Sequence, residues 1–145
     1  MQRRSLLGLG VAGAAVLALA GGGAALMYER AWHDGKLLPA GRRVLAAVAR
    51  GVLDGSLPSD SAAQAAAIGG HLTRLEATVS AMPTHTQSEI ADLLALLAMP
   101  PLRATVAGLF VAWEQASVSE VQVALQSMRQ SSLLLRRQAY GALRD

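Results

Sequence analysis

The chain has 145 residues, is 52% hydrophobic and 3% aromatic, and carries a formal net charge of +3. This length allows one small domain, and an apolar content rich in alanine favours closely packed helices, so an all-α fold is expected. The sequence contains no cysteine, which excludes disulfides, thiolate metal sites and cysteine nucleophiles. The arginines are dispersed instead of clustered, so the composition does not indicate nucleic-acid binding.

Residues 1–20 have the features of an export signal. Two adjacent arginines are followed, after one residue, by two large apolar residues, which is typical of twin-arginine signals. A moderately apolar stretch then ends in the A-x-A pattern of a signal cleavage site. The predicted signal residues are Arg3, Arg4, Leu6 and Leu7, and the predicted cleavage site lies at Ala18, Ala20 and Gly21. A twin-arginine signal predicts export of the folded chain to the periplasm.

Two alternatives stay open for this segment. Residues 5–28 carry no charge and as a helix would span about 36 Å, enough to cross a hydrocarbon core of about 30 Å, so one alternative is a retained membrane anchor up to residue 28. The other is an ordinary secretory signal. Glycine at six positions of the run weakens its helix propensity, which favours the twin-arginine signal. The expected location is the periplasm, tethered to the inner membrane if the segment is retained.

After the signal, the pattern predicts a linker over 21–39 and a helical domain over 40–145. Its part from Glu29 to Pro39 contains charged residues and one glycine and ends in a proline. The first helix of the domain is predicted over 40–53, because apolar residues recur there at intervals of three and four. Gly55 lies in the turn that follows it.

Ser59 or Asp60 is expected to cap a second helix, because a side-chain oxygen there accepts an unpaired N–H of the first turn. Its apolar residues fall on one face and need a partner surface. They are Ile68, Leu72, Leu75, Val79 and Met82. A bend is expected at Gly69 and Gly70, and Pro83 ends the helix.

The second half of the chain is predicted to hold three further helices. A capping box over 86–89 begins the third, and Pro100 with Pro101 separates it from a short fourth helix. The fourth helix is expected to carry Leu102, Val106, Leu109, Phe110 and Trp113 on one side. A second capping box over 117–120 begins the last helix, whose apolar rhythm continues to Leu143. About five helices after the signal fit a small antiparallel bundle.

The sequence shows no arrangement typical of catalysis or cofactor binding. His33, His71 and His85 are isolated from other metal-ligating residues at helical spacing. Glu89 and Asp92 are three residues apart, but acids in the first turn of a helix favour its macrodipole. Phosphate loops, dinucleotide fingerprints and nucleophile elbows are absent from the sequence. We therefore expect a protein without catalytic residues, a metal or a cofactor.

Two segments, LLPAGRRVLAAVARGVLDG at 37–55 and SSLLLRRQAYGALRD at 131–145, carry a family resemblance. Together with the helix pattern, they resemble the small subunits of flavin-dependent membrane dehydrogenases, which include the third subunit of gluconate dehydrogenases and the γ subunit of glucose dehydrogenases. The resemblance implies a helical, cofactor-free protein exported by the twin-arginine route. It also implies a partner, a large flavoprotein of the glucose-methanol-choline type, for which the small subunit acts as chaperone and carrier.

The segment at 128–140 is apolar on more than one helical face, which suggests a second buried contact. Aromatic residues and arginines dominate interface energetics. The expected partner-binding residues are Phe110, Trp113, Leu134, Arg136 and Tyr140. For Phe110 and Trp113, packing in the domain core stays open as an alternative. A stand-alone protein that binds a small apolar ligand, and a membrane-anchored protein that self-associates, are the alternatives for the whole chain.

Overall fold

The computed structural model describes residues 26–144. These residues are mostly helical, which confirms the all-α prediction, and they include one two-stranded hairpin. The elements are β1 (Trp32–His33), β2 (Lys36–Leu37), α3 (Pro39–Val52), α4 (Ser61–Ser80), α5 (Thr84–Ala98), α6 (Pro100–Leu102), the π-helix η1 (Arg103–Ala107), α7 (Val118–Arg129) and α8 (Leu134–Arg144). The predicted export residues Arg3, Arg4, Leu6 and Leu7 and the cleavage residues Ala18, Ala20 and Gly21 lie outside the described residues.

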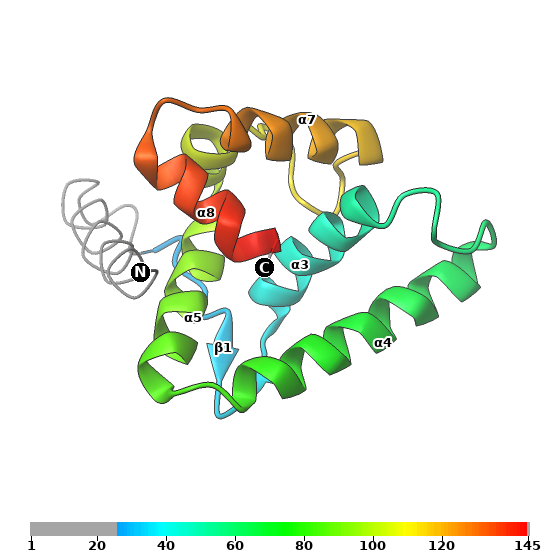
Figure 1. Ribbon diagram of the computed structural model, residues 1–145, viewed down its shortest axis with the longest axis horizontal. Coiled ribbons are helices and arrows are strands. Elements are labelled where there is room, and N and C mark those ends of the chain that lie inside the picture. The colour runs from blue at the N-terminus through cyan, green and yellow to red at the C-terminus, as the bar shows by residue number, and fades with distance from the viewer. Residues whose placement is uncertain (1–25, 145) are drawn as a thin grey trace.

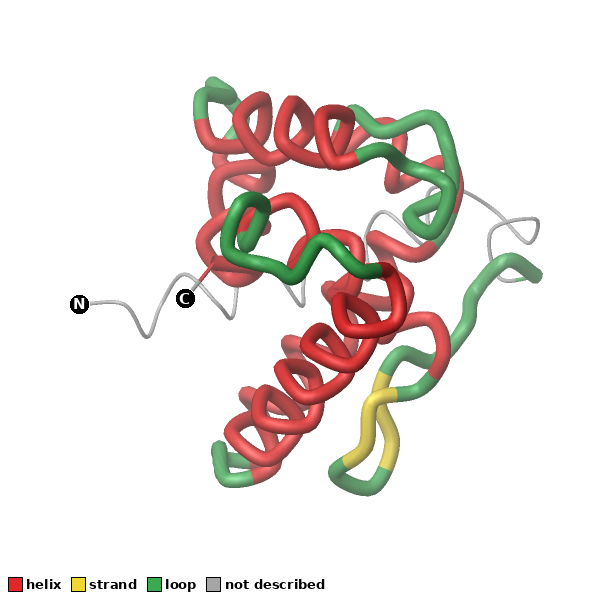
Figure 2. Tube along the Cα trace, turned by 90° about the vertical axis from the view of Figure 1, so that its right-hand side faces the viewer, coloured by secondary structure: helices red, strands yellow, loops and turns green. Residues whose placement is uncertain are grey.

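Residues 31–38, within the segment assigned to a linker, belong to the folded domain. Strands β1 and β2 pair antiparallel around a turn in which Asp34 and Gly35 have φ of 46° and 74°, the positive values that a tight hairpin requires at both central positions. Ala31 and Leu37 are buried in the core. Figure 2 shows this hairpin in yellow at one edge of the helices.

Helix α3 lies in the middle of the domain and packs against α4, α5 and α7 (Figure 1). Its buried residues are small or branched, namely Ala40, Gly41, Val44, Leu45, Ala47, Val48, Ala49 and Gly51. Gly51 marks a close approach to α7, because a Cβ at this position would lie 2.7 Å from Cγ1 of Val121. Small side chains therefore let three helices approach α3 closely.

Helix α4 is tied to the hairpin through a buried carboxylate. Glu76 accepts the backbone N–H of Leu37 at 2.8 Å and a hydrogen bond from Nζ of Lys36 at 3.1 Å, and Nη2 of Arg42 lies 3.6 Å away. The backbone hydrogen bond, followed by the contact with Lys36, lowers the pKa of Glu76 below its ordinary value. The ionised carboxylate thus joins α4 to the start of the described chain.

The start of α4 and most of its apolar face agree with the sequence prediction, whereas the expected bend does not. Asp60 caps the helix by accepting the N–H of Ala63 at 2.8 Å, as expected. Four of the five residues predicted for the apolar face are buried or half-buried against the core, namely Ile68, Leu72, Leu75 and Val79. The bend expected at Gly69 and Gly70 is not present, since the helix continues unbroken from Ser61 to Ser80.

The capping box predicted over 86–89 does not form. Helix α5 begins earlier, at Thr84, with the extended backbone of Pro83 preceding it and no side-chain cap. Instead of capping α5, Gln87 donates from Nε2 to the carbonyl oxygens of Ser80 and Met82 at 3.1 and 2.9 Å. Its side chain therefore provides hydrogen-bond donors for backbone carbonyl oxygens at the C-terminal end of α4 and just after it.

Two predictions for the second half are wrong in their helix boundaries. The fourth helix ends at Ala107, because Gly108 adopts a left-handed conformation with φ of 71°, so Leu109, Phe110 and Trp113 lie in a loop. The predicted last helix is two helices, α7 and α8, separated at residues 130–133. There, Oγ of Ser131 accepts the N–H of Leu133 at 3.2 Å, and such local bonds compete with the helix.

Candidate functional site

The loop between η1 and α7, residues 108–117, is held in place by a buried arginine. Arg103 is 8% exposed and donates from Nε to the carbonyl oxygen of Leu109 at 3.2 Å and from Nη2 to that of Phe110 at 3.4 Å. Burial lowers the pKa of the Arg103 guanidinium, and nearby Glu114 opposes this shift. We refer to residues 108–117 as the pinned loop.

Two further contacts anchor the middle of the pinned loop. Trp113 is 1% exposed, and its Nε1 donates to the carbonyl oxygen of Leu97 at 2.7 Å. Arg50 of α3 donates from Nη2 to the backbone carbonyl oxygens of Trp113 and Ala116 at 3.0 and 3.4 Å. The loop is irregular in conformation, but its carbonyls are tied to helices on two sides.

The pinned loop presents an aromatic ring to solvent. Phe110 is 81% exposed, and its neighbour Val111 is 37% exposed. Full burial of a phenylalanine side chain is more favourable than its exposure by about 1.5–3 kcal/mol of free energy. Because the backbone on either side of this ring is already hydrogen-bonded, contact with a partner would cost little further ordering.

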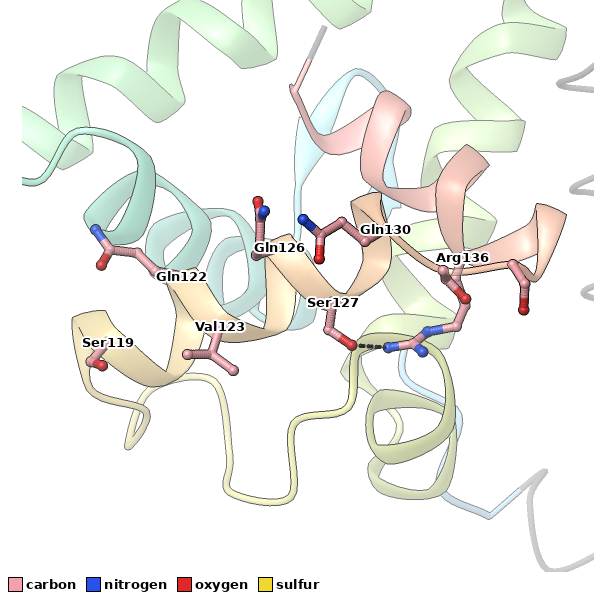
Figure 3. Close-up of a pocket in the computed structure, with 9 residues that line it drawn as sticks. Ser119, Gln122, Val123, Gln126, Ser127, Gln130 and Arg136 are labelled. Atoms are coloured by element: carbon pink, nitrogen blue, oxygen red, sulfur yellow. Dashed lines mark hydrogen bonds between the residues drawn. The ribbon is translucent and has the colours of Figure 1, made fainter.

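Arg136 of α8 binds to the two helices between which this loop runs. It donates from Nε to the carbonyl oxygen of Val106 at 2.7 Å. Figure 3 shows its second bond, from Nη2 to Oγ of Ser127 at 2.8 Å. The guanidinium therefore joins α8 to the end of η1 and to α7. Leu133 and Leu134, just before and at the start of α8, are 62% and 60% exposed.

The residues that the sequence predicts to bind a partner differ in their exposure to solvent. Phe110 and Leu134 are exposed, whereas Arg136 and Tyr140 are half-buried. Trp113 packs inside the domain, so its assignment to the partner-binding surface is corrected, and the alternative of core packing holds for this residue. Sequence reasoning did not identify Arg50 and Arg103, which hold the loop.

A shallow polar depression runs along the outer face of α7 toward Arg136 (Figure 3). Its lining is rich in neutral hydrogen-bonding groups, namely Ser119, Gln122, Gln126, Ser127, Gln130, Ser131 and Ser132. Gln122 already donates from Nε2 to the carbonyl oxygen of Gly51 at 3.1 Å. The depression is lined by amides and hydroxyls, and no carboxylate is among the described residues that line it.

Residues 26–144 contain no group of three histidine, aspartate or glutamate side chains placed to hold a metal ion. His33 lies 3.3 Å from Asp34, and both side chains are largely exposed. Burial raises the pKa of Asp92.

In the described part of the chain, none of the helices taken alone has both the length and the apolar character needed to cross a bilayer. Helix α5 and the segment Pro100–Ala107, bent by 89°, meet those criteria as a pair.

The comparisons with known proteins give no match for this chain among protein-family models, curated proteins or solved structures.

Proposed function

We propose that the protein is a non-catalytic small subunit that binds a large flavin-dependent dehydrogenase and is exported with it by the twin-arginine route. The observation that supports this proposal best is the exposed ring of Phe110 on a loop that Arg103, Arg50 and Trp113 hold in place. Aromatic residues in pre-ordered segments are typical hot spots of protein interfaces.

Exposed apolar side chains at the start of α8 also favour a partner contact. Leu133 and Leu134 expose aliphatic side chains at the start of α8, and Arg136 links α8 to η1, the element from which the pinned loop emerges. The resemblance of the segments at 37–55 and 131–145 supplies the class of partner, a flavoprotein of the glucose-methanol-choline type. The export route is inferred from the paired Arg3 and Arg4, which are typical of a twin-arginine signal.

Purification of the tagged full-length chain from its native host, with mild detergent, tests this proposal. We expect a stoichiometric complex with a larger subunit that shows flavin absorbance and reduces an artificial electron acceptor. Replacing Arg3 and Arg4 with lysine should leave both subunits in the cytoplasm. A chain that purifies alone as a monomer, with no flavin and no effect of the paired substitution on its location, would contradict the proposal.

A further inference from the structure

An apolar groove lies between α3, α4 and α5, with the last residues of α8 at its margin. Its volume is about 400 Å³, within the range of roughly 300–1,000 Å³ that small-molecule sites occupy. The walls are aliphatic and include Leu45, Val48, Leu75, Val79, Ile90 and Leu93. Three helices therefore enclose a space that the domain's own side chains leave unfilled.

The ionisable side chains that line this groove are basic. They are His71 and Arg74 on α4 and Arg144 at the end of α8, and no aspartate or glutamate is among the described residues of the lining. Within residues 26–144, the Arg74 guanidinium takes part in no hydrogen bond or ion pair, and Arg74 is exposed. Charge complementarity thus calls for an occupant with an apolar body and an anionic end.

The volume of the groove limits how much of an occupant it can hold. An α-helix about 10 Å in diameter with a 5.4 Å pitch fills about 420 Å³ in a single turn, so the groove holds about one turn of a helix. We favour a single alkyl chain with an anionic head group, because it matches both the aliphatic walls and the basic side chains of the lining.

We propose that this groove binds a long-chain fatty acid, with the alkyl chain among the aliphatic residues and the carboxylate at Arg74. The aliphatic walls remove the chain from water, which supplies most of the affinity. The arginine fixes the orientation by a charge-assisted hydrogen bond. The site is separate from the contact proposed at Phe110, so neither proposal depends on the other.

Isothermal titration of the delipidated full-length chain with oleate, below the concentration at which oleate forms micelles, tests the site. Arg74→Gln should weaken oleate binding roughly two- to fivefold, as expected for an exposed charge pair, and should leave the affinity for oleyl alcohol unchanged. Arg129→Gln is the matched control, because Arg129 is an exposed arginine on α7 outside the groove, and it should change neither affinity.

A second pair of variants tests the apolar wall. Val52 is 59% exposed and lines the groove, whereas Val123 is 65% exposed on α7 away from it, so both tolerate a polar side chain. Val52→Glu should weaken oleate binding at least about tenfold by placing a charged carboxylate in the apolar wall against the alkyl chain, and Val123→Glu should not. Absence of oleate binding, equal loss in both members of either pair, or saturation by an acidic amphipathic peptide with no response to oleate would overturn the proposal.

Discussion

The indole Nε1 of Trp113 donates a hydrogen bond of 2.7 Å to the carbonyl oxygen of Leu97, near the end of α5. In a continuing helix, this carbonyl would accept the N–H four residues later, but that position is Pro101, which has no N–H. The side chain of Trp113 therefore satisfies a buried acceptor that the proline leaves unpaired. The same bond holds the pinned loop against the core.

Trp113→Phe removes the donor and keeps an aromatic ring in the core. We expect the free energy of unfolding to fall by about 1–3 kcal/mol, because a buried carbonyl oxygen loses its partner. Urea denaturation followed by circular dichroism measures the change. Trp32→Phe is the control, since the indole of Trp32 bonds to Gln87 at 3.3 Å in a partly buried position, and its loss should cost less. Equal costs would contradict this role for Trp113.

Gly51 and Gly69 should respond in opposite ways to replacement by alanine. A Cβ at Gly51 would lie 2.7 Å from Cγ1 of Val121, whereas nothing lies within 4 Å of a Cβ at Gly69. Gly51→Ala should destabilise by about 1–3 kcal/mol through overpacking. Gly69→Ala should stabilise by about 0.5–1 kcal/mol through helix propensity. Thermal unfolding of the two variants compares them, and a Gly51→Ala variant as stable as wild type or more stable would show that α3 and α7 approach each other less closely than described.

The hydrogen-bonded carboxylate of Glu76 predicts a dependence of stability on pH. Its pKa is lower in the folded chain than its ordinary value of 4.5, so its contribution is fully present above that value and is lost as the pH falls through the folded-state pKa. Glu76→Gln should therefore lower the melting temperature at pH 7 and have a smaller effect in acid. Glu89→Gln on α5 serves as the control. A difference between wild type and Glu76→Gln that stays constant or grows in acid would contradict this assignment.

Arg103 should control the order of the pinned loop. Arg103→Met keeps the aliphatic stem but leaves the carbonyl oxygens of Leu109 and Phe110 without this donor. We expect a loss of about 1–3 kcal/mol in stability and faster amide exchange in residues 108–112. Arg74→Met is the control because Arg74 lies in the groove on α4. Unchanged exchange in the loop of Arg103→Met would show that other contacts suffice to hold it.

Sequence reasoning was most successful where the determining contacts are local. The prediction of a cap at Ser59 or Asp60 is confirmed for Asp60, and the capping box Ser117–Glu120 is confirmed as well, because a cap depends on residues within one turn. The apolar periodicity at Leu109, Phe110 and Trp113 was misleading, since these residues face different environments in a loop. The sequence prediction did not consider Gly108, although glycine is the residue type that most often ends a helix in a left-handed conformation.

The long-range contacts of the candidate site could not be predicted from the sequence. Arg50 lies 63 residues before the carbonyl that it binds at Trp113, and Arg103 looks like any other arginine in a dispersed set. Their roles follow from tertiary packing, which places unpaired carbonyls beside them. The hairpin at 32–37 was also missed, although Asp34-Gly35 is a favourable turn pair, because strands of two residues are too short to show alternation.

The most direct test of the proposed subunit role is the binding of the proposed flavoprotein partner by Phe110→Asp and Val52→Asp variants. Both side chains are exposed, at 81% and 59%, so both variants should keep the wild-type melting temperature within error. We expect Phe110→Asp to weaken the complex by about thirtyfold or more, as at an interface hot spot, with Val52→Asp close to wild type. Wild-type affinity in Phe110→Asp would contradict the account.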